Sequence, residues 1–235
     1  MSAPNPLIAR IREALKTTAP VPGSGDHGAH GAHAGQGAKP SLHASSEFSQ
    51  WLPAVGSSLE SQLALFAKNS VDLKSEFCLL ADQDAMAARL QELAKECGWQ
   101  RVATHSGGLT DVVVPALGLP CIKTDGGYDV AELERSDVGI TECDALVAQT
   151  GSVLVTALSA GGRALSVLPP HHLVLARRTQ MVPDLPAAYD CLRQKYGNDF
   201  PSFMSFITGP SRTGDIERIL VLGAHGPKRL TILVC

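Results

Sequence analysis

The stretch DVGITECDALVAQTGSVLVTAL, residues 137–158, decides the expected fold. It begins with a short apolar run at 137–141 that predicts a strand. A segment at 144–150 that we predict to be helical comes next, and the apolar run 152–158 predicts a second strand. Strands that are apolar on both faces are typical of buried parallel sheets. Strands that alternate with helices predict a parallel sheet with helices packed against it.

The same alternation continues on both sides of this stretch. We predict helices at 57–68, 82–97, 129–135, 185–196 and 215–222, and strands at 75–80, 101–104, 120–122, 172–176 and 230–235. Gly98 is expected to end the second of these helices, because glycine readily takes the left-handed conformation found there. The expected fold class is α/β, with an open, mostly parallel sheet and helices on both faces.

The chain of 235 residues is expected to have three parts. Apolar residues at helical spacing predict a short helix within residues 1–16. Residues 17–45 are rich in Gly, Ala and His and carry almost no large apolar side chain, so we predict a flexible linker. Its histidines at steps of three are compatible with metal binding, but a low-complexity linker is the favoured interpretation. Residues 46–235 are expected to form the α/β domain.

Composition excludes several classes of protein. A net charge of −3 argues against a nucleic-acid binder, which needs a basic surface. No apolar run approaches the length of a membrane helix, and no secretory signal is evident, so we expect a cytoplasmic protein. The six cysteines never occur at CxxC spacing, which argues against zinc-ribbon and ferredoxin patterns. We therefore expect reduced thiols and no metal or cofactor bound by this chain.

The densest polar cluster is TGPSRTGDIE, residues 208–217, where a turn is expected to lead into a helix. Hydroxyls, free backbone N–H groups and a guanidinium are typical of a pocket for a carboxylate or phosphate. A capped helix with a solvated arginine is the alternative. The ligand-binding candidates here are Thr208, Gly209, Ser211, Arg212, Thr213 and Asp215.

A second candidate segment is GAHGPK, residues 223–228. Its glycines and proline are typical of a helix stop. His225 adds a group that titrates near neutral pH, and we take it as a candidate catalytic residue beside the ligand-binding candidate Gly226.

A third cluster surrounds the end of the strand at 137–141. Thr141 and Glu142 stand at the strand exit, where open α/β sheets bind ligands, and a polar turn follows at Gln149, Thr150, Gly151 and Ser152. Glu142 is the candidate catalytic acid or base, whereas Asp144 is expected to be a first-turn helix acid. Cys143 lacks a histidine that can be placed beside it, so we do not favour a nucleophile there. Because loops at carboxyl strand ends gather on one edge, we predict that all three clusters meet in one cleft.

Five segments in this order carry a family resemblance: GIT at 139–141, QTGS at 149–152, LPPHH at 168–172, TGPSRTGDIE at 208–217 and HGP at 225–227. Over Ser46 to Cys235 the chain resembles the lactate-utilization protein C family, whose members carry the LUD domain. The resemblance implies a fold like that of ribose-5-phosphate isomerase and the CoA-transferases. It also implies a part in oxidising L-lactate to pyruvate alongside iron–sulfur partner proteins. Gln149 departs from the pattern, because many relatives have glutamate there.

Three functions follow as hypotheses. The first is a non-redox subunit of an L-lactate-oxidising complex that binds a small anionic ligand or partner subunits. The second is a free-standing enzyme of the isomerase or CoA-transferase type, acting on a phosphorylated or acyl substrate. The third is a small-molecule sensor.

Overall fold

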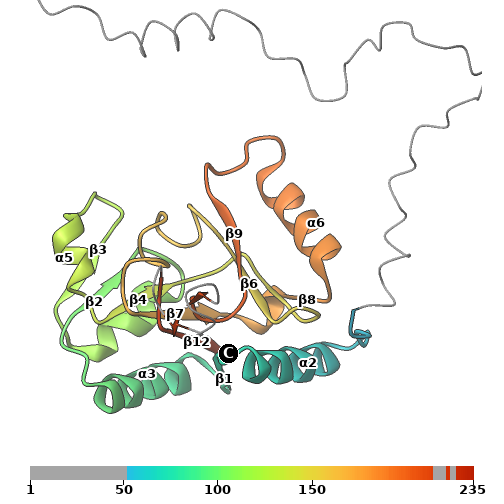
Figure 1. The fold of residues 1–235 in the computed structure, drawn as a ribbon, viewed down its shortest axis with the longest axis horizontal. Helices are drawn as coiled ribbons and strands as arrows, with labels where there is room; N and C mark the ends of the chain where they lie inside the picture. Colours follow the sequence, from blue (N-terminus) through green and yellow to red (C-terminus); the bar gives the residue numbers. More distant parts are fainter. Residues whose placement is uncertain (1–51, 214–220, 223–225) are drawn as a thin grey trace, which may run out of the picture. The chain divides into compact units, whose positions relative to one another are not determined.

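A computed structural model describes residues 52–213, 221–222 and 226–235 of the chain (Figure 1). The helix predicted within residues 1–16 and the linker predicted at 17–45 lie outside the described residues.

Six parallel strands form the main sheet. In spatial order they are β1 (Glu76–Leu79), β12 (Arg229–Val234), β7 (His171–Ala176), β4 (Val138–Thr141), β2 (Val102–Thr104) and β3 (Cys121–Lys123). Successive residues on each strand face opposite sides of the sheet, and β4, β7 and most of β12 are buried on both. The predicted α/β class with an open, mostly parallel sheet is confirmed.

Helices cover both faces of this sheet. One face packs against α3 (Gln83–Cys97), α4 (Thr110–Val113) and the 3-10 helix η3 (Val114–Leu117). The other face receives α2 (Leu59–Asp72) and α5 (Val130–Glu134). The limits of α3 follow from its sequence, because the Asp82 side chain caps its first turn and Gly98, at φ 66°, ends it as predicted. None of the helices in the described part of the chain is long and apolar enough to cross a membrane.

A second, four-stranded sheet packs against the α2 side of the main sheet. Its order is β8 (Met181–Val182), β5 (Ala145–Val147), β6 (Ser152–Thr156) and β9 (Met204–Ile207), and η4 (Arg178–Gln180) leads into β8. The outer side of this sheet packs against α6 (Leu185–Tyr196), which Figure 1 shows beside β8. The chain between β4 and β12 therefore builds a layer that the sequence pattern did not predict.

The predicted helix at 144–150 is wrong, because this segment contains strand β5. Leu146 packs into the core between the two sheets, whereas Ala145 and Val147 pack on the α6 side. Both sides of the strand are buried, so the segment has no polar alternation. A short apolar run of this kind fits a buried strand or a buried helix equally well by periodicity.

The predicted helix at 215–222 is wrong at its carboxyl end. Val221–Leu222 form β11, which pairs antiparallel with β10 (Arg212–Thr213). Residues 214–220 lie outside the described residues. The pairing joins two segments through a backbone ladder, which local periodicity does not encode.

Asp144 anchors α6 to the second sheet, and is not the first-turn helix acid that the sequence suggested. Its Oδ1 accepts hydrogen bonds from Lys195 Nζ at 2.5 Å and from Tyr196 Oη at 2.7 Å. Burial raises the pKa of Asp144, but the hydrogen bonds from Lys195 and Tyr196 outweigh burial and hold that pKa below its usual value. The carboxylate is therefore a structural ion-pair partner, with a fully buried side chain.

Replacing Lys195 with Met should destabilise the protein, because it leaves the buried Asp144 carboxylate without its cation. Removing one partner of a buried ion pair lowers the free energy of unfolding by about 3–5 kcal/mol. We expect the lower end of this range because the Lys195 side chain is half exposed. Urea unfolding measures the change. Arg193→Met is the control, since Arg193 pairs with Asp190 on the exposed side of the same helix and should change stability by at most about 0.5 kcal/mol. Equal stability of both variants would contradict the anchoring role.

Candidate functional site

The carboxyl ends of β2 and β4 form the point where the main sheet reverses its winding. From β2 the chain moves outward to β3, whereas from β4 it moves the other way to β7 and β12. In open α/β sheets such a point is the usual ligand site. His105 follows β2 there, and Glu142 follows β4.

Glu142 holds the loop that follows β2. Its Oε1 accepts hydrogen bonds from the backbone N–H groups of Leu109 at 2.6 Å and Thr110 at 3.1 Å. The backbone N–H of Glu142 donates to His105 Nε2 at 3.1 Å. That nitrogen is therefore unprotonated, and His105 Nδ1 carries the proton that it donates to Ser106 O at 2.9 Å. The two loops are thus fixed to each other by the carboxylate and the imidazole.

Two glycines allow this close packing. A Cβ on Gly107 would lie 2.3 Å from Glu142 Oε1, and a Cβ on Gly108 would lie 3.1 Å from Arg177 Nη2. Arg177 follows β7, and its Nη1 lies 3.8 Å from Glu142 Oε2. We call His105, Gly107, Gly108, Glu142 and Arg177 the carboxyl-edge cluster. Of these residues only Glu142 was a candidate from the sequence, although a glycine pair two residues after a predicted strand was an available signal.

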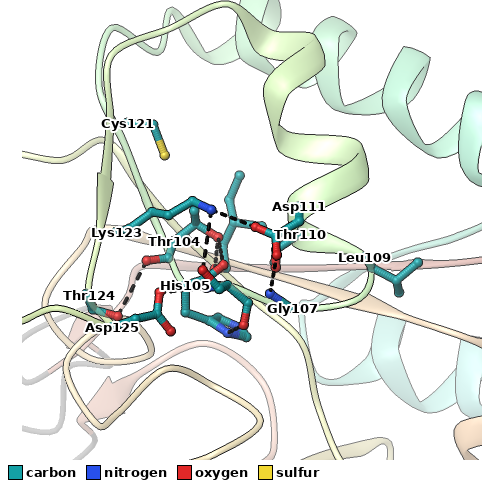
Figure 2. A network of polar contacts seen from close by, with 12 residues as sticks. Thr104, His105, Gly107, Leu109, Thr110, Asp111, Cys121, Lys123, Thr124 and Asp125 are labelled. Atoms are coloured by element: carbon teal, nitrogen blue, oxygen red, sulfur yellow. Dashed lines mark hydrogen bonds and ion pairs between the residues drawn. The ribbon is translucent and has the colours of Figure 1, made fainter.

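Figure 2 shows the polar network beside this cluster. Lys123 Nζ donates to Asp111 Oδ1 at 2.6 Å, and this hydrogen bond lowers the pKa of Asp111. Asp125 Oδ2 accepts from the backbone N–H of Ser106 at 2.7 Å, and Asp111 Oδ2 accepts from that of Gly107 at 3.2 Å. The carboxylates of Asp111 and Asp125 therefore hold the backbone of the loop that follows β2. This geometry favours a positioning role for Glu142, and a catalytic role for it stays a prediction.

A cavity of about 200 Å³ lies at the opposite edge of the main sheet. Here Lys228 N donates to Pro170 O at 2.8 Å, just before β12 and β7 begin. We call this cavity the amino-edge cavity, because it lies where β7 and β12 begin. It is lined by Ser166, Val167, His172, Ile207, Gly209, Pro210, Ser211, Gly226, Pro227 and Leu230. Three predicted ligand-binding residues, Gly209, Ser211 and Gly226, are among its walls.

The prediction that all three clusters meet in one cleft is wrong. Glu142 lies at the carboxyl edge, whereas Ser211 and Gly226 line the amino-edge cavity. The loop at 208–211 follows β9 of the second sheet, and Pro227 precedes β12. Neither segment leaves the carboxyl end of a strand in the main sheet, so the rule that gathers such loops on one edge does not apply to them.

Thr141 is tied to the amino-edge cavity through His172. Thr141 Oγ1 and His172 Nε2 lie 2.9 Å apart, and both residues are buried. Burial lowers the pKa of His172 to about 3, and the neighbouring charge of His171 contributes in the same direction. The imidazole is therefore neutral near pH 7. Its Nδ1 has no hydrogen-bond partner among the described residues.

The predicted turn residues Gln149 to Ser152 have local roles. Asn69 of α2 donates to the backbone oxygens of Ala148 and Gln149, at 2.8 and 3.0 Å. Gln149 Nε2 donates to Pro53 O at 3.0 Å. Gly151 has φ 65°, and a Cβ there would lie 2.8 Å from Asn69 Cβ. These contacts fix the turn to α2, and the hydroxyl oxygen of Thr150 is buried in it, although the residue as a whole is only partly buried.

The remaining candidates divide between described and undescribed positions. Ser152 Oγ and Thr208 Oγ1 lie 2.7 Å apart, which joins β6 to the segment that leads to the cavity. Arg212 is exposed, and its Nη2 lies 3.3 Å from the position of a Cβ on Gly209, a wall of the cavity. The side chain of Thr213 and residues Asp215 and His225 lie outside the described residues.

Adjacent histidines on β7 face opposite sides of the sheet. His171 Nε2 lies 2.8 Å from Thr231 Oγ1 on the α3 side, and its ring packs edge-on against Trp99. Cys143 is buried, and burial raises its pKa well above the usual range of a thiol, which disfavours a nucleophile there.

Comparison with known proteins identifies the C-terminal part of the chain. The family model for the LUD domain matches residues 129–235. Residues 129–235 belong to the LUD domain family. The matched segment contains β4, all the residues that line the amino-edge cavity and the whole second sheet. The match confirms the predicted resemblance for this part of the chain.

Curated proteins to which this chain is similar carry the name lactate utilization protein C. The relative from Bacillus subtilis is 33% identical over 125 residues, which cover 51% of this chain and 52% of the relative. The relative from Deinococcus radiodurans is 32% identical over 143 residues, covering 57% of this chain and 66% of the relative. The match to the first of these thus spans about half of the relative's length.

The fold is similar to that of a solved structure. It is a DUF162 family protein from Deinococcus radiodurans, with a TM-score of 0.59 and 20% sequence identity. The likeness covers 76% of this chain and 99% of that protein. The α/β fold is therefore shared beyond the segment that the family model matches.

The stability of the fold should fall as the pH is lowered below about 6.5, because β7 buries two neutral histidines. Burial lowers the pKa of His171 to about 4, and the charge of Arg229 contributes less in the same direction. Burial lowers the pKa of His172 to about 3, with a smaller contribution from His171. The unfolded chain binds these protons near pH 6.5 and the folded chain only below pH 4. Between those two pH values, each histidine should thus lower the free energy of unfolding by about 1.4 kcal/mol for every unit that the pH falls.

Urea unfolding at pH 7, 6 and 5 tests this, since most carboxylates stay ionised in that range. His171→Phe and His172→Phe should each give a shallower pH dependence than the unchanged chain. A flat profile in the unchanged chain would show that these histidines are protonated in the folded state.

Proposed function

We propose that the chain acts in lactate utilization as a non-redox component of an L-lactate-oxidising complex, and that it binds a small organic anion. The observation that carries this proposal is the LUD domain at residues 129–235, shared with relatives named lactate utilization protein C. The matches cover only part of those relatives, so the role of the whole protein comes to this chain as a proposal.

The cysteine pattern supports a component without its own redox centre. The six cysteines are Cys78, Cys97, Cys121, Cys143, Cys191 and Cys235, and all are free thiols. Iron–sulfur clusters are usually held by closely spaced cysteines, which this sequence does not contain. In the proposed complex, electrons pass through iron–sulfur partner proteins, and this chain supplies ligand binding or assembly.

The anion site of this proposal is the amino-edge cavity with Arg212 beside it. The cavity combines apolar walls with few polar groups, as small-molecule sites do. The Arg212 guanidinium next to the Gly209 wall offers charge-assisted hydrogen bonds to a carboxylate or phosphate. Thr208 and Ser152 hold the segment that carries both residues.

A free-standing isomerase or CoA-transferase needs a carboxylate that faces its substrate. Glu142 is the best candidate, but its Oε1 accepts two backbone N–H groups at the edge opposite the cavity. The geometry therefore favours a binding role over independent turnover.

Replacing Arg212 with Ala should weaken anion binding. A charge-assisted hydrogen bond contributes about 1.5–3 kcal/mol, so the affinity should fall by somewhat more than tenfold at the low end. Calorimetric titration with lactate, pyruvate and phosphate measures the change. Arg193→Ala, an exposed arginine on α6, is the matched control and should keep the affinity. If the Arg212 variant binds as tightly as the unchanged chain, Arg212 is not the anion residue.

Membership in the complex predicts co-purification. An affinity-tagged chain isolated anaerobically from its own cells should bring with it proteins that carry CxxCxxC motifs and iron. Mass spectrometry and iron analysis of the eluate test this. Recovery of the chain without iron–sulfur proteins would contradict the complex while leaving the anion site open to titration.

A further inference from the structure

An apolar groove lies between α2 and β1, at the end of the main sheet (Figure 1). Its volume is about 750 Å³. Phe77 fixes the floor of the groove, because its ring packs edge-on against Phe66 of the core. Leu59 and Leu79 also line the groove, but they are 44% and 45% exposed. Exposed apolar side chains gathered around a groove are typical of a surface that binds another molecule. The described walls are Leu59, Glu60, Leu63, Ala64, Ala67, Phe77, Leu79 and Arg178.

Strand β1 is open at the same place. It pairs with β12 on one side, and no described strand pairs with its other side. Phe77 and Leu79 are two residues apart, so their side chains share the face of the sheet that lies toward α2. An open end strand can pair with other chains unless a neighbouring element covers it. A helix seated in the groove provides such a cover.

The outer side of α2 is complementary to itself. Glu60, Ala64 and Lys68 are exposed and follow one another at intervals of four residues, so they lie on one side of the helix. Neither Glu60 nor Lys68 forms an ion pair with another described residue. If two such helices cross antiparallel at Ala64, each Glu60 faces the Lys68 of the other helix. The small side chain of Ala64 allows close approach at the crossing point.

This symmetry of charge points to the occupant of the groove. A contact about a two-fold axis places the same patch on both sides, so the patch must match itself. The acid and the base of α2 stand at equal distances along the helix on either side of Ala64, which meets this condition. The apolar residues Leu59 and Leu63 border the same stripe and supply the surface to be buried.

We propose that α2 and the adjoining groove form a dimer interface, in which α2 of a second copy of this chain packs antiparallel against α2 with Ala64 at the two-fold axis. Leu59 and Leu79 become buried in this dimer, and the open side of β1 is covered. The groove shares no described wall with the amino-edge cavity, so the proposal does not depend on the proposed function.

Sedimentation velocity of the full chain over a range of micromolar concentrations tests the dimer. We expect the sedimentation coefficient to rise with concentration to that of a dimer. Ala64→Arg should raise the dissociation constant by more than about a hundredfold, because two like charges then face each other across the axis. Ala88→Arg is the matched control, since Ala88 is an exposed alanine within α3, and it should leave the dimer intact. Circular dichroism melting verifies that both variants are folded.

Reversing the charges on α2 tests the antiparallel arrangement separately. Glu60→Lys and Lys68→Glu should each raise the dissociation constant about tenfold, because each change puts two pairs of like charges into the interface. The double variant restores opposite charges at both positions and should dimerise like the unchanged chain. All three changes are at exposed positions, so the fold should be retained.

Three outcomes would overturn the proposal. A chain that stays monomeric at every concentration would leave the groove to a different protein. A dimer that Ala64→Arg leaves intact would place the contact between copies elsewhere on the surface. Failure of the double variant to recover would exclude the antiparallel pairing of Glu60 with Lys68.

Discussion

Burial of β7 on both faces is the constraint on which the rest of the structure depends. This strand lies between β12 and β4 in the main sheet, and every residue from His171 to Ala176 is buried. Its two histidines face opposite sides, so each must find its hydrogen bonds in a different layer. His171 meets Thr231 under α3, and His172 meets Thr141 beside the second sheet. Desolvation keeps both rings neutral, which makes the centre of the fold sensitive to acid.

Glycines allow close approach of the loops at both ends of the main sheet's strands. At the carboxyl edge, Gly107 leaves room for the Glu142 carboxylate, which fixes the loop after β2. Within β4, a Cβ on Gly139 would lie 2.2 Å from Leu165 O. The segment after Leu165 can therefore rest directly on the sheet, and it carries Ser166 and Val167 to the amino-edge cavity. A larger side chain at either glycine would displace a loop that shapes one edge.

The two edges differ in how completely their polar groups are paired. At the carboxyl edge, carboxylates meet backbone N–H groups and cations, so the cluster forms a closed network. At the amino edge, a buried imidazole nitrogen has no described partner. The amino edge also has a cavity with Arg212 near its Gly209 wall, so we place the ligand there and not at the edge that open α/β sheets usually use. The second sheet makes the difference, because β9 delivers Gly209 and Ser211 to the start of β12.

The sequence by itself determined the α/β class and the limits of α3 through Asp82 and Gly98. These features depend on local periodicity, capping and turn chemistry, which neighbouring residues encode. Only the tertiary structure decided that 144–150 contains a strand, that Glu142 and Ser211 lie at opposite edges, and that His172 lines the cavity. Each of those depends on pairing and register between segments far apart in the chain. Side-chain patterns within one segment carry no information about the partner against which it will be buried.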